Sequence, residues 1–333
     1  MAHAIAAMTY YDVFNGDADG LCALHQLRLA EPAQSVLVTG VKSDIALLPR
    51  VPAGAGDKVT VLDISIDANR TALLAMLARG AAVLYVDHHS HAGVPLNPLL
   101  HAHIDHSADT CTGMIVDRYL AGRFRIWAVV AAFGDNLDAQ AEGLARSLAL
   151  DAQQTAALQE LGRCLNYNAY GNAVSDLNID PAALYQCLHQ YADPFEFIRS
   201  QPLFQRLRGA LARDLDRAAR LARRLPSSAG RIIVLPDARW SRRVRGVYAN
   251  QLARAAPAQA HALLVMHPDG TYTVSVRAPL EGIGALQGAD RLCRQFEHGG
   301  GRTAAASVPR LPKCRLASFI QAFEAVFGMH QAP

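Results

Sequence analysis

The sequence has few marks of a disulfide-stabilised, membrane-spanning or strongly charged protein. Its six cysteines are scattered and include no CxxC pair, which favours reduced thiols in a cytoplasm over a disulfide framework or a zinc knuckle. No apolar run is long enough to span a bilayer. Residues 1–8 lack a basic segment followed by a long apolar core. We therefore expect no signal peptide and a cytoplasmic protein.

The charge balance is mild, because the formal net charge is +3. This value does not by itself indicate a nucleic-acid partner. Arginine is dense between residues 199 and 254, and residues 203–225 predict a long helix that connects two domains. Arginines on such a helix most often form a solvated face, and attraction to a phosphate backbone is the alternative. Residues 226–230 predict a hinge.

The 333 residues are enough for two domains. Short apolar runs alternate with helical periodicity in the first part of the chain, which predicts an α/β fold with a parallel sheet and right-handed crossovers. We expect an N-terminal parallel-sheet domain over residues 1–150, a helical connecting segment over residues 151–229 and a smaller C-terminal α/β domain over residues 230–333. Strands are predicted at residues 10–14, 35–39, 58–62, 81–86, 231–236, 262–266 and 271–276, and helices at 21–29, 69–77, 114–120, 244–255 and 283–296.

Carboxylates follow several of the predicted strands. Asp17 and Asp19 follow the first strand, Asp63 follows the third, and the sequence Asp87-His88-His89 follows the fourth. The carboxyl ends of strands in an open α/β sheet are where ligands bind, and Asp and neutral His suit Mn²⁺, Zn²⁺ or similar ions. A calcium loop is the alternative at Asp17 and Asp19, but an apolar helix follows where further ligands would be needed. The pattern predicts a metal centre.

Further polar residues follow in the chain. Asp135 ends an apolar segment, residues 127–133, which is either a strand or a helix. Residues 101–109 contain three histidines and two aspartates, which we interpret as a polar loop rather than as a metal motif. The helix that begins after Thr112 has N-terminal amides that could hold a phosphate. Near the C-terminus, three glycines precede Arg302, and backbone amides and a guanidinium can bind an anion.

The order of these motifs resembles the DHH family of phosphoesterases, and the C-terminal part resembles the DHH-associated domain of its exonuclease and oligoribonuclease branch. The four N-terminal motifs are seen here as Asn15-Gly16-Asp17-Ala18-Asp19-Gly20, Val61-Leu62-Asp63, Asp87-His88-His89 and Gly134-Asp135-Asn136. The C-terminal matches are Ser275-Val276-Arg277 and the run from Gly299 to Ala306.

The resemblance implies a hydrolase that acts on phosphoester bonds of a nucleotide or short single-stranded oligonucleotide, with two divalent metals. Mn²⁺ is the expected ion, with Mg²⁺ or Co²⁺ as alternatives. It implies that Asp17 and Asp63 hold one ion and that Asp63 bridges to a second. The metal ligands would be Asp17, Asp19, Asp63, His88 and Asp135; the catalytic residues Asp87, His88 and His89; the substrate-binding residues Arg277, Gly299, Gly300, Gly301 and Arg302.

The resemblance also implies roles for single residues and for the substrate-binding domain. Asp87 would orient His88 or assist from behind it, and His89 would face the substrate phosphate. The C-terminal residues would bind substrate across an interdomain cleft. No membrane partner is expected, and a homodimer is left open.

Three positions depart from the family pattern. Asn15 stands where many relatives have an acid and Val13 where another branch has a histidine, which predicts a metal site that is weaker or lacks a ligand. Arg302 stands where the glycine motif usually has histidine, which changes how a phosphate is held. These departures motivate the alternative of a degenerate protein that binds nucleotides or nucleic acid without cleaving them. A pyrophosphatase is less consistent with Arg277 and the glycine run.

Overall fold

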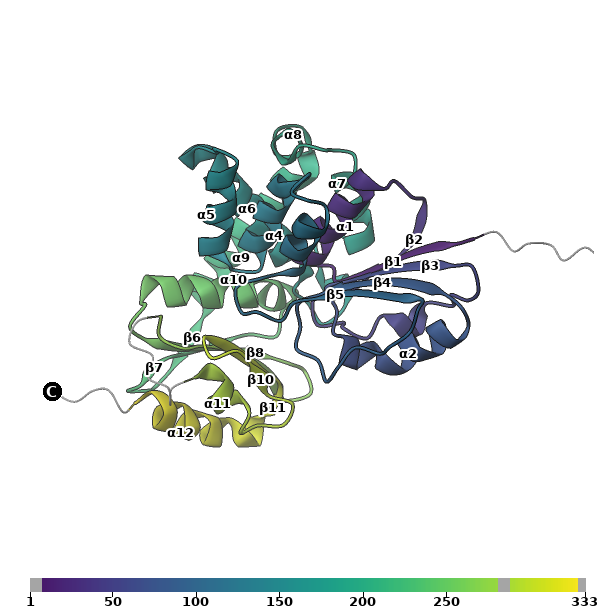
Figure 1. Cartoon of the computed structure of the whole chain (residues 1–333). Coiled ribbons are helices and arrows are strands. Elements are labelled where there is room, and N and C mark those ends of the chain that lie inside the picture. Colours follow the sequence, from purple (N-terminus) through teal and green to yellow (C-terminus); the bar gives the residue numbers. More distant parts are fainter. Residues whose placement is uncertain (1–7, 281–287, 329–333) are drawn as a thin grey trace, which may run out of the picture. The chain divides into compact units, whose positions relative to one another are not determined.

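The structure is a computed structural model that describes residues 8–280 and 288–328 (Figure 1). The chain divides into two compact units, Met1–Gly209 and Ala210–Pro333. Most of the N-terminal segment that we interpreted as lacking a signal peptide, and the first residues of the helix predicted at 283–296, lie outside the described residues. Within the described ranges, no helix is both long and apolar enough to cross a membrane.

The first unit contains a five-stranded sheet. Its strands are β1 (Tyr10–Phe14), β2 (Ser35–Val38), β3 (Lys58–Leu62), β4 (Ala82–Asp87) and β5 (Leu100–Ile104), in the order β2-β1-β3-β4-β5. Every neighbouring pair is parallel, so the predicted α/β class and parallel sheet are confirmed. Val13, Val61 and Tyr85, on three adjacent strands, pack into one buried cluster.

The fifth strand was not predicted, because the interpretation of residues 101–109 as a loop was wrong at its start. His101 lies opposite Leu84 and His103 opposite Val86 in a regular parallel pairing. Both histidines are exposed, while Leu100, Ala102 and Ile104 pack against the core. The strand is amphipathic. Its two histidines made the segment look polar, although Leu100, Ala102 and Ile104 alternate with them.

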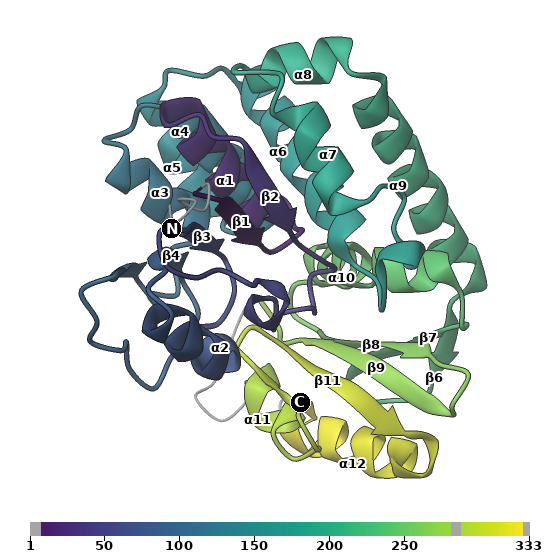
Figure 2. The same cartoon turned by 90° about the vertical axis from the view of Figure 1, so that its right-hand side faces the viewer.

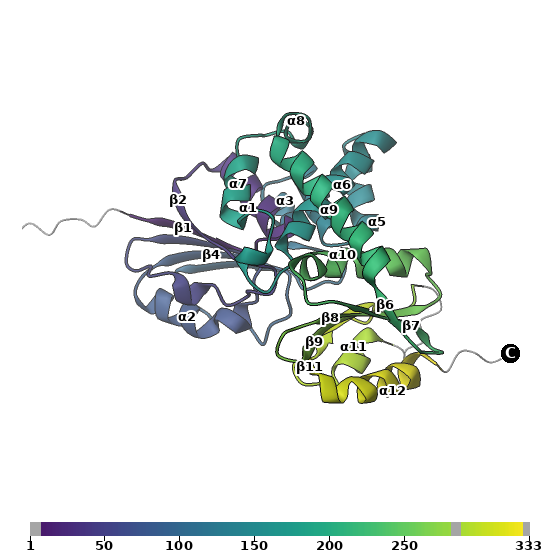
Figure 3. The same ribbon diagram turned by 180° about the vertical axis from the view of Figure 1, so that it is seen from behind.

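Helices cover both faces of this sheet, as Figure 1 and Figure 3 show. The helices are α1 (Ala18–Ala30), α2 (Ile66–Ala78), α3 (Thr112–Tyr119), α4 (Arg125–Gly134), α5 (Asp138–Ser147), α6 (Ala152–Ala169), α7 (Pro181–Leu188) and α8 (Pro194–Ser200), with short 3-10 turns at Leu48–Arg50 and Val174–Asp176. One face carries α2, and the other carries α1, which packs against α3, α4 and α6. The apolar segment before Asp135 is the helix α4.

The arginine-rich helix α9 (Pro202–Leu221) crosses the division between the units and ends earlier than predicted. The edge strand β6 (Arg223–Leu225) follows it, pairs antiparallel with β7 (Gly230–Leu235) and buries Leu225. Pairing with β7 therefore overrides the helical continuation to residue 225 that we predicted from periodicity.

The second unit contains a mixed six-stranded sheet in the order β10-β11-β9-β8-β7-β6. After β7, its elements are α10 (Arg239–Ala255), β8 (Ala260–Met266), β9 (Thr271–Arg277), α11 (Ala289–Cys293), β10 (Gly300–Gly301), β11 (Ala305–Pro312), the 3-10 turn Lys313–Arg315 and α12 (Leu316–Phe327). The predicted hairpin of β8 and β9 is confirmed. Helix α10 packs on one face, and α11 and α12 pack on the other (Figure 2).

Candidate metal centre

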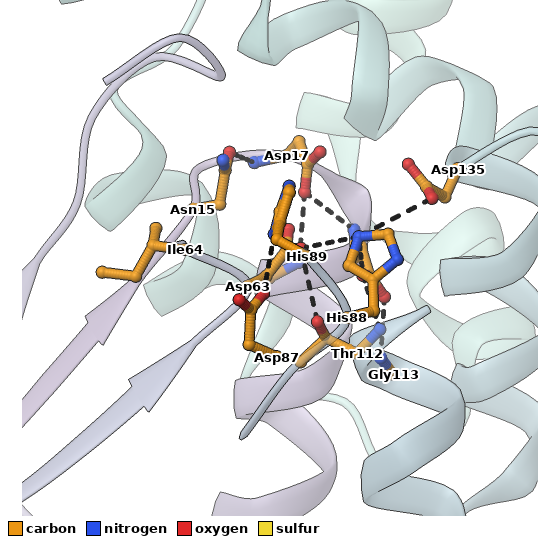
Figure 4. Close-up of polar contacts among 12 residues, drawn as sticks. Asn15, Asp17, Asp63, Ile64, Asp87, His88, His89, Thr112, Gly113 and Asp135 are labelled. Carbon is orange, nitrogen blue, oxygen red and sulfur yellow. Dashed lines mark hydrogen bonds and ion pairs between the residues drawn. The ribbon is translucent and has the colours of Figure 1, made fainter. Parts of the chain in front are cut away.

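The carboxyl ends of β1, β3 and β4 bring together acidic and imidazole side chains from distant parts of the sequence. These three strands are neighbours in the sheet, so Asp17, Asp63 and His88 follow strands that end at one edge. Asp135 joins them from the C-terminus of α4. Figure 4 shows these side chains turned toward a common centre. The sheet order explains the convergence that the strand-end pattern predicted.

Asp17 is the N-cap of α1. Its Oδ1 accepts hydrogen bonds from the backbone amides of Asp19 (3.0 Å) and Gly20 (3.1 Å), as a capping carboxylate does. Its Oδ2 accepts from the ammonium of Lys42. Burial by itself would raise the pKa of Asp17, but the charge and hydrogen bond of Lys42 lower it to about 2. Asp17 is therefore a buried, ionised carboxylate.

Asp19 connects the first helix of the unit to α3. Its Oδ2 accepts from the amide of Thr112 (2.8 Å), and its Oδ1 accepts from the amide of Gly113 (2.7 Å). We predicted that these amides could hold a phosphate, and that interpretation was wrong, because an internal carboxylate already occupies them. The helix N-terminus instead fixes the position of Asp19.

His88 lies at the centre of the acidic cluster. Its Nε2 lies 3.3 Å from Asp63 Oδ1 and 3.9 Å from both Asp19 Oδ2 and Asp135 Oδ2. On the other side of the ring, Nδ1 lies 3.0 Å from the carbonyl oxygen of Thr110. A carbonyl can only accept a hydrogen bond, so Nδ1 carries the hydrogen and the Nε2 lone pair can bind a metal, the usual way that a ligating histidine is oriented.

The electrostatics of the cluster show a demand for positive charge. Burial raises the pKa of Asp63 well above its usual value, and the neighbouring charges of Asp17 and Asp19 raise it further. Burial would lower the pKa of His88, but its hydrogen bond with Asp63 and the surrounding carboxylates raise it to about 10. The buried carboxylates thus stabilise positive charge at His88 and disfavour ionisation of Asp63.

Asp87 contacts His89. Asp87 is fully buried, and its Oδ1 lies 2.7 Å from His89 Nδ1, while the His89 side chain is 41% exposed. We expected Asp87 to orient His88 or to assist from behind it; in the structure the carbonyl of Thr110 holds His88 Nδ1, and Asp87 holds His89. Adjacent residues on the chain point to different partners, which a sequence motif does not reveal.

Lys42 is the residue of the centre that sequence reasoning missed. It follows β2, and its ammonium contacts Asp17 and lies 3.6 Å from Asp135 Oδ1. Burial disfavours the charged ammonium, but Asp17 and Asp135 hold the pKa of Lys42 well above its usual value. No local motif surrounds Lys42, so only the pairing of β2 beside β1 could have indicated its place.

The donor set fits a divalent ion. Asp63, His88 and His89 place ligand atoms within 4.8 Å of one another, and the carboxylates of Asp19 and Asp135 approach the same face of His88. Carboxylate oxygens with one or two imidazole nitrogens suit Mn²⁺, Mg²⁺ and Zn²⁺. A bound cation would also offset the mutual repulsion of the buried carboxylates. We therefore interpret this edge as a candidate metal centre.

The C-terminal residues that we predicted lie together in the second unit. Arg277 ends β9 and pairs with Ala305, and the next residue of β11, Ala306, pairs with Gly301. Gly301 has φ 143°, and a Cβ atom there would lie 2.5 Å from Ala306 Cα. Arg302 closes a tight turn through reciprocal backbone hydrogen bonds with Ala305. Glycine is required for this turn, so the glycine run has a structural role besides any role in binding.

Two hydrogen bonds hold the side chain of Arg277 in the glycine-arginine corner, the region formed by Arg277 and residues 299–302. Its Nε donates to Asn250 Oδ1 (2.6 Å) and its Nη1 donates to the carbonyl of Val276 (3.0 Å). These contacts leave the guanidinium partly exposed. Asn250, on α10, was not predicted as part of the site.

No protein-family model matches the chain, and no curated protein matches it. Solved structures do match. The chain has the DHH-domain fold. It aligns with a structure described as the DHH domain of a member of a family of ribosomal proteins, at a TM-score of 0.66 and 12% identity, over 96% of this chain and 86% of that chain.

Two further DHH-fold matches are enzymes. Exonuclease RecJ bound to manganese gives a TM-score of 0.59 and 16% identity, with 98% of this chain and 91% of that chain covered. The pGpG-specific phosphodiesterase PggH from Vibrio cholerae gives a TM-score of 0.54 and 14% identity, with 95% of this chain and 99% of that chain covered. At these identities the likeness concerns the fold, which extends over both units.

Proposed function

We propose that the chain is a divalent-metal-dependent phosphoesterase that hydrolyses a phosphate ester bond of a nucleotide or short oligonucleotide. One observation carries the proposal: the Nε2 atom of His88 faces three carboxylates within 3.9 Å, while Thr110 holds its Nδ1 atom. An oriented imidazole with clustered carboxylates is expected of a metal centre.

The roles of the residues follow from their contacts. Asp19, Asp63, His88 and Asp135 would hold an ion, which when bound would polarise a phosphoryl oxygen and lower the pKa of a water molecule. Asp87 fixes the tautomer of His89, because its carboxylate faces Nδ1. In its imidazolium form, the half-exposed His89 ring would donate from Nε2 to an oxygen of the substrate phosphate while Nδ1 donates to Asp87.

The second unit would supply substrate binding. Arg277 and Arg302 carry guanidinium groups, which can form paired hydrogen bonds to a phosphate, and the turn at Gly299, Gly300 and Gly301 presents backbone at the surface. We propose that this corner holds a phosphate or a terminal nucleotide of the substrate. The manganese in the RecJ structure and the dinucleotide named for PggH support Mn²⁺ and a short substrate as the first choices.

The test is Mn²⁺-dependent hydrolysis over a panel of bis-p-nitrophenyl phosphate, a dinucleotide, a nucleoside bisphosphate, a cyclic dinucleotide, single-stranded DNA and pyrophosphate. We expect the wild type to hydrolyse one nucleotide class. In Asp63→Asn the rate should fall at least about a hundredfold, because loss of a metal ligand lowers activity more than loss of a residue that only orients a ligand. Glu142→Gln, on an exposed part of α5, is the matched control and should keep wild-type activity.

Two outcomes would oppose the proposal. Equal activity of Asp63→Asn and wild type would remove Asp63 from the chemistry. A folded wild-type protein that binds Mn²⁺ and nucleotides but cleaves nothing would favour the alternative of a binding protein. Circular dichroism of both variants separates either outcome from unfolding.

A further inference from the structure

Lys42 places a permanent positive charge within the proposed metal centre. Its ammonium contacts Asp17 Oδ2, and it lies 3.6 Å from Asp135 Oδ1 and 3.4 Å from Asn166 Oδ1. The Lys42 side chain is 29% exposed. An ammonium so close to two carboxylates supplies charge at the place where a further cation would otherwise be needed.

Asp17 differs from Asp19 in having a cationic partner, because an ammonium and not only backbone amides contacts its carboxylate. Oδ1 caps α1 by accepting from Asp19 and Gly20, and Oδ2 accepts from Lys42. The neighbouring side chain, Asn15, carries no charge. On this side of the centre, the charge of Lys42 would repel an ion that approached Asp17, and Asn15 would give the ion only a neutral ligand.

Several contacts fix Lys42 in this position. The amide of Asn15 donates to the carbonyl of Lys42 (3.2 Å), and the backbone N–H of Lys42 donates to the carbonyl of Ala169 (2.9 Å). The loops after β1 and β2 also approach closely, because a Cβ atom on Gly16 would lie 2.2 Å from the carbonyl oxygen of Gly40. A carboxylate at position 15 could not donate to Lys42, so asparagine and lysine act together.

Asp135 divides the centre into two parts. Its Oδ1 faces Lys42 at 3.6 Å and its Oδ2 faces His88 Nε2 at 3.9 Å. Around His88 lie Asp63 and Asp19, with oxygens at 3.3 and 3.9 Å. One part of the centre thus offers several ligands to an ion, and the other already contains a cation.

We propose that Lys42 takes the place of one of the two cations, so that the chain binds a single divalent ion beside His88. The inference rests on the proposed metal centre and replaces the expectation of two ions. In this arrangement Asn15, which departs from the family pattern, holds the backbone of Lys42 in place through its side-chain amide.

The experiment measures the number of Mn²⁺ ions per chain by equilibrium dialysis with elemental analysis, and their spacing by electron paramagnetic resonance. We expect one ion with the spectrum of an isolated Mn²⁺ in the wild type. In Lys42→Met, which keeps an unbranched side chain one atom shorter and removes its charge, we expect two ions with a spin-coupled spectrum, as for ions about 3.5–4 Å apart. Lys313→Met, at an exposed position of the second unit, should behave as wild type.

The outcomes separate this inference from the proposed function. Two spin-coupled ions in the wild type would overturn the role of Lys42 and leave the phosphoesterase proposal intact. One ion in both the wild type and a folded Lys42→Met would also overturn it. No ion in the wild type would overturn the metal centre and the inference together. If Lys42→Met does not fold, Lys42→Gln, which also removes the charge, decides: a second ion supports the inference, and a folded variant with one ion opposes it.

Discussion

The acidic edge of the first sheet and the glycine-arginine corner of the second sheet differ in burial and in charge. Asp17, Asp19 and Asp63 are at most 2% exposed, whereas Arg302 is exposed and Arg277 is partly exposed. The acidic edge is formed by parallel strands whose ends meet, and the corner is formed by an antiparallel turn.

This difference suits the acidic edge to metal binding and the corner to phosphate binding. Buried carboxylates repel one another in a low-dielectric environment and need a cation, so the acidic edge is suited to holding metal. Exposed guanidinium groups cost little to keep charged and can meet an arriving phosphate. The two regions should therefore respond differently to substitution, the first through metal binding and turnover, the second through substrate affinity.

The largest effect is expected from packing at the acidic edge. A Cβ atom on Gly113 would lie 2.5 Å from Ala131 Cβ and 3.1 Å from Asp19 Oδ1. Gly113→Ala should therefore displace α3 and the amides that hold Asp19, lower Mn²⁺ affinity about 10–100-fold and destabilise the fold by about 1–3 kcal/mol. Titration with Mn²⁺ and thermal unfolding measure both.

The matched control is Gly143→Ala on α5, where the nearest atom to a new Cβ is the end of the Arg146 side chain at 3.8 Å. This variant should bind Mn²⁺ like the wild type. If Gly113→Ala also binds normally, the backbone amides of α3 do not determine the position of Asp19.

A smaller effect is expected at the corner. Arg302→Ala should raise KM for the nucleotide substrate about tenfold or more, because a hydrogen bond to a charged group contributes roughly 1.5–3 kcal/mol, and should leave kcat nearly unchanged. Steady-state kinetics test this split. Arg310→Ala, which removes an exposed arginine of β11 paired with Asp269, is the control. A fall in kcat with constant KM would contradict the assignment of the corner to substrate binding.

The smallest effect is a pH dependence of stability from His25 on α1, which also carries Asp19. Burial lowers the pKa of His25 to about 3, even though Nε2 lies 2.9 Å from the carbonyl of Tyr191. The folded ring stays neutral while the unfolded ring gains a proton below about pH 6.5. The stability contributed is therefore present above pH 6.5 and declines as the pH falls toward 3.

His25→Gln should remove this slope, up to about 1.4 kcal/mol per pH unit. Chemical denaturation between pH 7 and 5 measures it in both proteins. His189, whose pKa burial also lowers, keeps its own contribution in the variant. Identical slopes in wild type and His25→Gln would show that the buried ring does not control acid sensitivity.

Patterns of neighbouring residues were enough to predict several elements of the first unit. Apolar runs that end in carboxylates predicted β1, β3 and β4, and the alternation with helices predicted a parallel sheet, because these patterns depend on residues close together in the chain. The resemblance to the DHH family, read from the order of the motifs, gave Asp17, Asp19, Asp63, His88 and Asp135 as the expected ligand set. The β5 strand was missed because its exposed histidines obscured a short apolar alternation.

The tertiary structure alone decided which side chains meet. Asp19 and Thr112 are far apart in the sequence, as are Lys42 and Asp17, and the sheet order brings each pair into contact. It also decided that Asp87 holds His89. A hydrogen bond forms only when the donor–acceptor distance is right to within a few tenths of an ångström. In this protein those distances are set by the packing of whole strands and helices.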